Sequence, residues 1–89
     1  MPGFNSEIKY KGGLFHIQTQ DKGPAVQYVE SFVYKSGKLL SSRKTFYTQF
    51  LSTPLLREKI QQIMEEQHNT LLKEITEGKF DHILSPDEK

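Results

Sequence analysis

The residues best suited to metal chemistry in this sequence are Glu65 and His68, which form a Glu-x-x-His pattern. On a helix this spacing stacks two potential ligands on one face, as in the di-iron sites of helical bundles. Such sites take further carboxylates from facing helices, and this chain has only one long helical segment. The other histidines, His16 and His82, complete no ligand spacing with the pair. The sequence therefore predicts no metal site and no cofactor.

Catalytic nucleophiles and phosphate-binding loops are not indicated either. The chain has no cysteine, and its serines lie outside any nucleophile-elbow pattern. Gly12-Gly13 joins two predicted strands, whereas a phosphate-binding loop leads from a strand into a helix. His16 shares a polar strip with Gln18 and Gln20 next to Asp21; we interpret it as a surface strip, with ligand recognition as the alternative. We predict no catalytic residue and a protein that is not an enzyme.

A set of aromatic and basic residues could bind nucleic acid. Aromatic side chains on an open sheet, flanked by cations, stack on the bases of single strands and attract their phosphates. The third predicted strand and the hairpin after it carry Tyr28, Phe32, Tyr34, Lys35, Lys38, Arg43 and Lys44. Glu30 lies among the aromatics and would repel phosphate. The alternative is that these aromatics pack in a core or a dimer contact.

Four segments have the composition and alternation of β-strands. Alternation with period two marks a half-buried strand, and short turns rich in Gly and Pro enforce antiparallel neighbours. The strands are predicted at Phe4–Lys11, Leu14–Gln20, Ala25–Lys35 and Leu39–Tyr47. Both sides of the third strand are partly apolar, so the pattern leaves open which face of the sheet is covered.

The segment Pro54–Glu77 has the period of an amphipathic helix. Ser52 or Thr53 could cap its start, and Gly78 is placed to take a left-handed conformation after its end. Its apolar stripe includes Gln67 and is flanked by His68 and Leu72. Together these elements predict an α+β fold, in which one long C-terminal helix packs across one face of a four-stranded antiparallel meander (ββββα).

The helix length suggests a second surface. Twenty-four residues span about 36 Å as a helix, whereas a seven-residue strand spans about 23 Å. A helix that projects past the sheet would leave its distal apolar residues for a partner. The candidate partner or dimer surface is therefore Leu71, Leu72 and Ile75.

The bulk properties are those of a small single domain. The chain has 89 residues and a formal net charge of +1, which gives no overall attraction to nucleic acid or membrane. No segment has the pattern of a signal peptide or a membrane span, so we expect no membrane partner and a cytoplasmic protein. We predict one domain over residues 1–84 and a flexible tail over residues 85–89.

Two resemblances can be stated. The motifs H-x-Q-T-x-D-x-G (from His16), E-S-x-V-Y (from Glu30), G-x-x-L-x-S (from Gly37) and E-x-Q-H (from Glu65) resemble a small bacterial domain family of unknown function. The order of four strands and one helix is similar to the repeat of the PUR family of single-stranded nucleic-acid binders, in topology only. Neither resemblance implies a functional residue here.

The function predicted from the sequence is a non-enzymatic protein-interaction or assembly module, homodimeric or bound to another protein. The alternative is a single-stranded nucleic-acid-binding domain that uses the aromatic and basic set.

Overall fold

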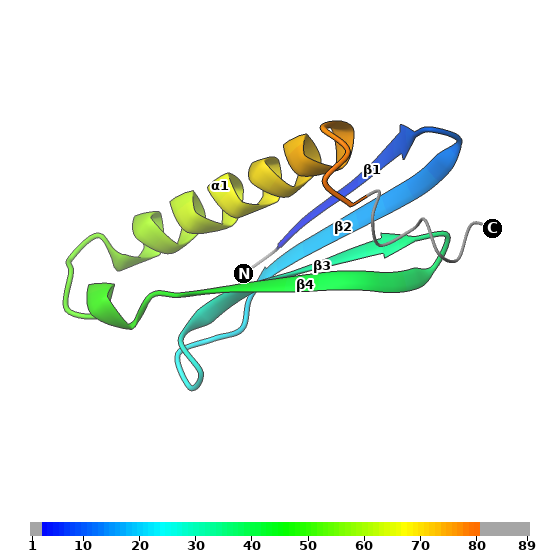
Figure 1. Ribbon diagram of the computed structural model, residues 1–89. Coiled ribbons are helices and arrows are strands. Elements are labelled where there is room, and N and C mark those ends of the chain that lie inside the picture. The colour runs from blue at the N-terminus through cyan, green and yellow to red at the C-terminus, as the bar shows by residue number, and fades with distance from the viewer. Residues whose placement is uncertain (1–2, 81–89) are drawn as a thin grey trace.

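The computed structural model describes residues 3–80 and confirms the α+β, ββββα fold. One antiparallel sheet has the strand order β1-β2-β3-β4, and one long helix, α1, lies across one of its faces (Figure 1). A short 3-10 turn, η1, joins the sheet to the helix. The elements are β1 (Phe4–Tyr10), β2 (Gly13–Asp21), β3 (Tyr28–Lys35), β4 (Lys38–Phe46), η1 (Thr48–Phe50) and α1 (Leu56–Thr76).

Two of the three hairpins close with two-residue loops. Lys11 and Gly12 have φ of 50° and 80°, and Ser36 and Gly37 have φ of 51° and 84°. Two consecutive positive φ values define the type I′ turn, whose twist matches that of the flanking strands. The first loop is thus Lys11-Gly12 and not the predicted Gly12-Gly13, because Gly13 already pairs with Tyr10 in the ladder.

The remaining hairpin, between β2 and β3, has a longer loop than predicted. The strand expected from Ala25 begins at Tyr28, and residues 22–27 form the loop. The Asp21 carboxylate accepts a hydrogen bond from the Gly23 backbone N–H at 2.9 Å, and the Gln27 N–H donates to the Gly23 carbonyl at 2.8 Å. These bonds fix the shape of the loop. Asp and Gly are residue types that favour turns.

The end of α1 follows the prediction and its start does not. Gly78 takes φ of 80°, its N–H donates to Ile75 O, and the Lys79 N–H donates to Glu74 O. This pattern is a Schellman motif, which satisfies the last carbonyls of a helix. At the start, no side chain caps the helix, which begins at Leu56 after a backbone bond from Leu56 N to Thr53 O. The predicted cap by Ser52 or Thr53 is therefore wrong.

The helix and the sheet have matching lengths. The 21 residues of α1 span about 31 Å at 1.5 Å per residue. The nine residues of β2 or β4 span about 30 Å at 3.3 Å per residue. The helix therefore has no apolar overhang, and the projection past the sheet that its length suggested does not occur, because α1 is shorter than Pro54–Glu77 and these strands are longer than seven residues.

The core between helix and sheet consists of two hydrophobic clusters. The first contains Phe15, Ile17, Val33, Leu71, Ile75 and Phe80, and the second contains Val29, Tyr47 and Met64. Phe80, two residues beyond Gly78, closes the first cluster as a buried side chain. The predicted flexible tail at residues 85–89, the end of the predicted domain at residue 84, and His82 lie outside the described residues.

Candidate functional site

The sheet face opposite α1 carries most of the predicted aromatic set. Successive side chains of a strand point to opposite faces, and Val29, Ser31 and Val33 of β3 are buried under the helix. Their neighbours Tyr28, Phe32 and Tyr34 therefore lie on the other face, as do the residues paired with them. We call this surface the open face, because no helix or strand among residues 3–80 covers it.

Exposed hydrophobic side chains extend the aromatic strip on the open face. Phe46 pairs with Tyr28 in the ladder, and their ring centroids lie 5.0 Å apart. Leu39 pairs with Tyr34 and is 51% exposed, and Phe46 is 57% exposed. Several apolar groups thus face outward along β3 and β4, where no other element of residues 3–80 covers the sheet.

Charges on this strip are balanced. Glu30 pairs with Lys44 across β3 and β4, and only 9% of Glu30 is exposed. The Lys44 ammonium lies 4.7 Å from the centroid of the Tyr28 ring, a cation–π distance. The one lysine of the predicted set that lies on the open face therefore has an aromatic and an acidic neighbour.

The remaining cations of the predicted set do not share the open face. Lys35 pairs with the buried Phe15 in the ladder, and Lys38 pairs with Lys35. Directly paired residues lie on the same face, so both lysines belong to the helix side at the far end of the sheet. The predicted seven-residue surface is thus divided between two faces.

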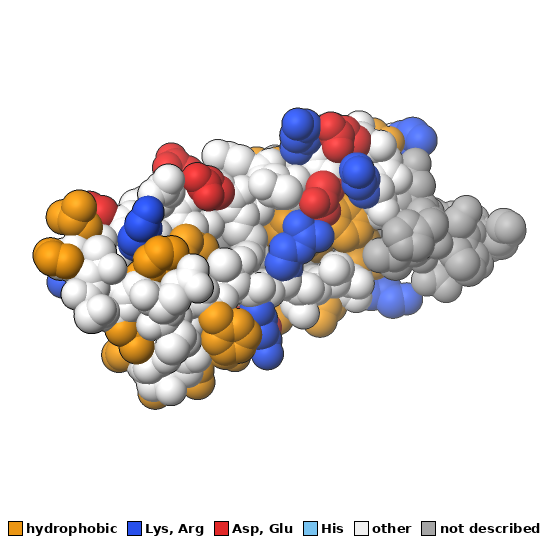
Figure 2. All heavy atoms as spheres, turned by 60° about the vertical axis from the view of Figure 1, so that its left-hand side comes forward, with side chains coloured by type: hydrophobic (Ala, Val, Ile, Leu, Met, Phe, Trp, Pro, Cys, Tyr) orange, Lys and Arg blue, Asp and Glu red, His pale blue; other side chains and the backbone are white. Residues whose placement is uncertain are grey.

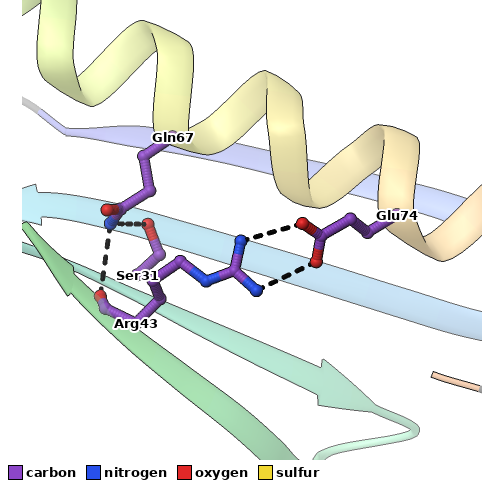
Figure 3. Close-up of polar contacts among 4 residues, drawn as sticks. All are labelled: Ser31, Arg43, Gln67 and Glu74. Atoms are coloured by element: carbon purple, nitrogen blue, oxygen red, sulfur yellow. Dashed lines mark hydrogen bonds and ion pairs between the residues drawn. The ribbon is translucent and has the colours of Figure 1, made fainter. Parts of the chain in front are cut away.

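Arg43 is bound to the helix and is not part of the aromatic surface. Its guanidinium donates two hydrogen bonds to the Glu74 carboxylate, at 3.0 and 2.9 Å (Figure 3). This bidentate geometry fits the planar guanidinium. The hydrogen bond from Arg43 lowers the pKa of the Glu74 carboxyl. Partial burial acts in the opposite direction, but the pKa remains below its ordinary value. The pair joins edge strand β4 to the last turns of α1.

A buried network of polar side chains crosses the interface between helix and sheet. Every strand contributes one hydroxyl, and α1 contributes an amide and an imidazole. Listed from β4 to β1 in bonding order, the members are Thr45, Gln67, Ser31, Thr19, His68 and Ser6. We call this network the polar belt. It lies between the two hydrophobic clusters.

The distances in the polar belt are those of hydrogen bonds. Gln67 Nε2 lies 2.8 Å from Ser31 Oγ and 3.2 Å from the Arg43 carbonyl oxygen, and Thr45 donates to Gln67 Oε1 (Figure 3 shows the contacts to Ser31 and Arg43). Ser31 Oγ lies 2.6 Å from Thr19 Oγ1. No deeply buried side-chain nitrogen or oxygen among residues 3–80 lacks a partner. The belt is therefore fully paired, as buried polar groups must be to avoid a desolvation cost.

His68 joins β2 to β1 in the belt, with both ring nitrogens engaged. Nε2 lies 2.8 Å from Ser6 Oγ, and Nδ1 lies 2.8 Å from Thr19 Oγ1. Ser31 accepts from Gln67, so its own hydroxyl is free to donate to Thr19, which in turn donates to Nδ1. A neutral imidazole protonated on Nε2 completes this direction of donation. Both ring nitrogens are thus used within the fold, and residues 3–80 hold no cluster of metal-ligating side chains.

Burial lowers the pKa of the His68 imidazole below its ordinary value, and His16 adds to the effect. In the unfolded chain a histidine takes up a proton near pH 6.5, whereas folded His68 stays neutral to lower pH. The unfolded state then binds more protons in that window, so stability falls as pH drops below about 6.5. Urea unfolding from pH 8 to pH 5 should show this decrease.

His68→Gln should lose this decrease, because glutamine keeps an acceptor and a donor without titrating. His16→Gln is the matched control and should retain most of it, because burial, the larger cause of the lowered His68 pKa, is unchanged. A His68→Gln variant with the same pH dependence as the parent protein would contradict the assignment.

The predicted partner surface lies inside the fold. Leu71 and Ile75 are each 1% exposed and pack against Phe15, Ile17 and Val33, and Leu72 packs partly buried beside them. Because the helix has no overhang, these residues cover the protein's own sheet. The expectation that these residues form a free docking surface is therefore wrong for the folded protomer.

The polar strip around His16 is also divided between the faces. His16 lies on the open face, with Nδ1 3.6 Å from a Glu7 carboxylate oxygen and Nε2 3.4 Å from Asn5 Oδ1. Asp21 accepts a hydrogen bond from Tyr47, a core residue under the helix. His16 and Asp21 therefore lie on opposite faces of the sheet and do not form a pair.

The belt hydroxyls were missed in the sequence, although a signal was present. Thr19 continues the alternating row of Phe15 and Ile17, and Ser31 lies between Val29 and Val33 in the same alternation. A hydroxyl in a row of core positions requires a polar partner. Gln67 in the helix stripe, with His68 at its edge, supplies that partner.

Comparisons of the chain with protein-family models, with curated proteins and with solved structures find no match. Within residues 3–80, no helix combines the length and the apolar character needed to cross a membrane.

Proposed function

We propose that this protein is a non-enzymatic assembly module that forms a homodimer through the open face. The observation that carries the proposal is the strip of aromatic and aliphatic side chains on the uncovered side of the sheet. A sheet layer that is apolar on both faces is stable when both faces are covered. In this fold α1 covers one face, and a second copy would cover the other.

A second copy fits this strip better than a strongly charged partner. The net charge of the chain is +1, and Glu30 and Lys44 stand opposite each other on the face. A two-fold contact places the same patch on both subunits, so it must be self-complementary. On β3 and β4, apolar side chains around one cation and one anion meet that requirement, and polar residues of β1 and β2 such as Glu7 and His16 form the rim.

The size of the face predicts a weak dimer. Four strands about 4.8 Å apart and about 27 Å long cover roughly 500 Å² on each protomer. Two such faces bury about 1,000 Å², the lower limit for a specific interface. We therefore expect an equilibrium between monomer and dimer that shifts with protein concentration.

Phe46→Glu should weaken the dimer at least tenfold, because each interface would then contain two uncompensated carboxylates. Phe46 is 57% exposed in the protomer, so the monomer should remain folded. Sedimentation velocity or light scattering across a wide concentration range measures the effect. Leu55→Glu is the control, since Leu55 is 61% exposed in the segment before α1, away from the open face.

A protein that stays monomeric at the highest accessible concentration would reject the dimer. So would equal weakening by Phe46→Glu and Leu55→Glu, which would place the contact elsewhere.

Single-stranded nucleic acid is the second candidate for the open face. Tyr28, Phe32 and Tyr34 share this face with Lys44, as a stacking platform requires. Against it, Arg43, Lys35 and Lys38 lie on the other side, and Glu30 lies between Tyr28 and Phe32. A monomer that binds a labelled oligonucleotide at low salt, and loses binding in Lys44→Ala, would favour this function over dimerisation.

A further inference from the structure

A pocket lies at the end of the molecule where the β2–β3 loop meets the start of α1. Its volume is about 520 Å³, within the usual range for small-molecule sites. Two residues with charged side chains, Asp21 and Arg57, and five largely apolar ones line it. The largely apolar residues are Pro24, Tyr47, Leu51, Leu56 and Ile60. We call it the end pocket; it is separate from the open face.

Hydrophobic side chains also surround this end of the molecule. Val26, Leu51 and Leu55 are 45%, 38% and 61% exposed. Figure 2, which turns this end toward the viewer, shows several separate hydrophobic groups in its left half. A clustered apolar surface around a cavity is typical of a binding site, whereas single exposed leucines are common on any protein.

The two charged residues of the pocket, Asp21 and Arg57, differ in the hydrogen bonds that they form within the protein. Asp21 Oδ1 accepts a hydrogen bond from the Tyr47 hydroxyl at 2.6 Å and another from the Gly23 N–H at 2.9 Å. Burial and the neighbouring Asp21 raise the pKa of Tyr47 to about 12, so its proton stays in place near neutral pH. The charge of Asp21 is therefore already stabilised by two donors.

Arg57 lines the pocket from an exposed position at the start of α1. Within residues 3–80, no other side chain forms a hydrogen bond or ion pair with its guanidinium. A planar guanidinium binds a carboxylate through two parallel hydrogen bonds. An anionic group at Arg57 with an apolar body in the pocket would match both parts of the lining, and Asp21 would repel an anion placed beside it.

We propose that the end pocket binds a small carboxylic acid with an apolar chain, its carboxylate on Arg57 and its chain against Leu56, Ile60 and Tyr47. Decanoate is a suitable probe. Binding should saturate in a titration followed by amide chemical shifts, with the largest changes in residues that line the pocket.

Two comparisons test the carboxylate contact. Decanoate should bind the full chain at least tenfold more tightly than decanol or decylamine. Arg57→Gln should weaken decanoate binding about tenfold and leave decanol binding unchanged. Lys59→Gln, a cation exchange on the same turn of α1 outside the pocket lining, is the matched control and should bind decanoate like the parent protein.

Equal affinity for decanol and decanoate would overturn the role of Arg57, and tighter binding of decylamine would assign the charged contact to Asp21 instead. Absence of saturable decanoate binding, or shifts confined to the open face, would overturn the site itself.

Discussion

Replacing Gln67 with alanine is expected to lower the free energy of unfolding by about 3 kcal/mol. The change would remove the acceptor of Thr45 and a donor to both Ser31 and the Arg43 carbonyl. A buried polar group left without its partner costs about 1–3 kcal/mol, and the lost volume adds to this. A chain of 89 residues has a total stability of about 4–13 kcal/mol, so urea unfolding should show the effect clearly.

A second variant at the same position separates hydrogen bonding from packing. Gln67→Met keeps most of the volume but cannot pair with Thr45, Ser31 or Arg43. We expect it to remain destabilised by at least about 1 kcal/mol, because the partners stay buried and unpaired. Gln62→Ala is the control, since its bond to Glu66 is exposed and surface changes cost at most about 0.5 kcal/mol. A Gln67→Met variant as stable as the parent protein would show that the amide is not needed.

The polar belt gives α1 a defined position on the sheet. Hydrophobic contacts are non-directional, so a leucine-rich stripe alone could slide along a row of valines and isoleucines. Bonds from Gln67 and His68 to hydroxyls on β1, β2, β3 and β4 are directional, and a shift by one helical turn would break them all. The same placement leaves the other face of the sheet without cover from residues 3–80, which is why we propose that assembly uses that face.

The element order could be predicted because its signals are local. The positive-φ glycines at Gly12 and Gly37, the alternation of β1 and β2, and Gly78 after the helix each depend on a few neighbouring residues. The core role of Phe15 and Ile17 follows from that alternation. These features needed no knowledge of the tertiary structure.

The surfaces were harder to predict because they depend on which face α1 covers. Both rows of side chains on β3 are partly apolar, one with Val29 and Val33 and the other with Tyr28 and Phe32. Composition alone therefore does not show which row faces the helix. Arg43 and Lys44 are adjacent in sequence, yet alternation places them on opposite faces, and grouping them by sequence proximity merged two surfaces. Strand alternation applied to β4 would have separated them.

Leu71→Glu is expected to unfold the protein. Leu71 is 1% exposed and lies between the sheet and the end of α1. Loss of a buried leucine costs about 2–5 kcal/mol, and an unpaired carboxylate in the same position adds several kcal/mol more. The sum is comparable with the whole stability expected of a chain this size. Circular dichroism at 25 °C should therefore show loss of helix and strand signal.

Two control variants show whether the effect of Leu71→Glu is on folding or on dimer formation. Leu71→Met conserves volume and should cost less than about 1.5 kcal/mol. Lys73→Glu introduces the same carboxylate two residues away, with a larger change in net charge, at a position where the Lys73 side chain is 74% exposed, and should leave the fold intact. If Leu71→Glu instead remained folded and became monomeric, Leu71 would have to lie at a subunit contact, and the dimer would involve α1 rather than the open face. Unfolding of Leu71→Glu together with a folded, monomeric Phe46→Glu would distinguish the core of the protomer from its interface.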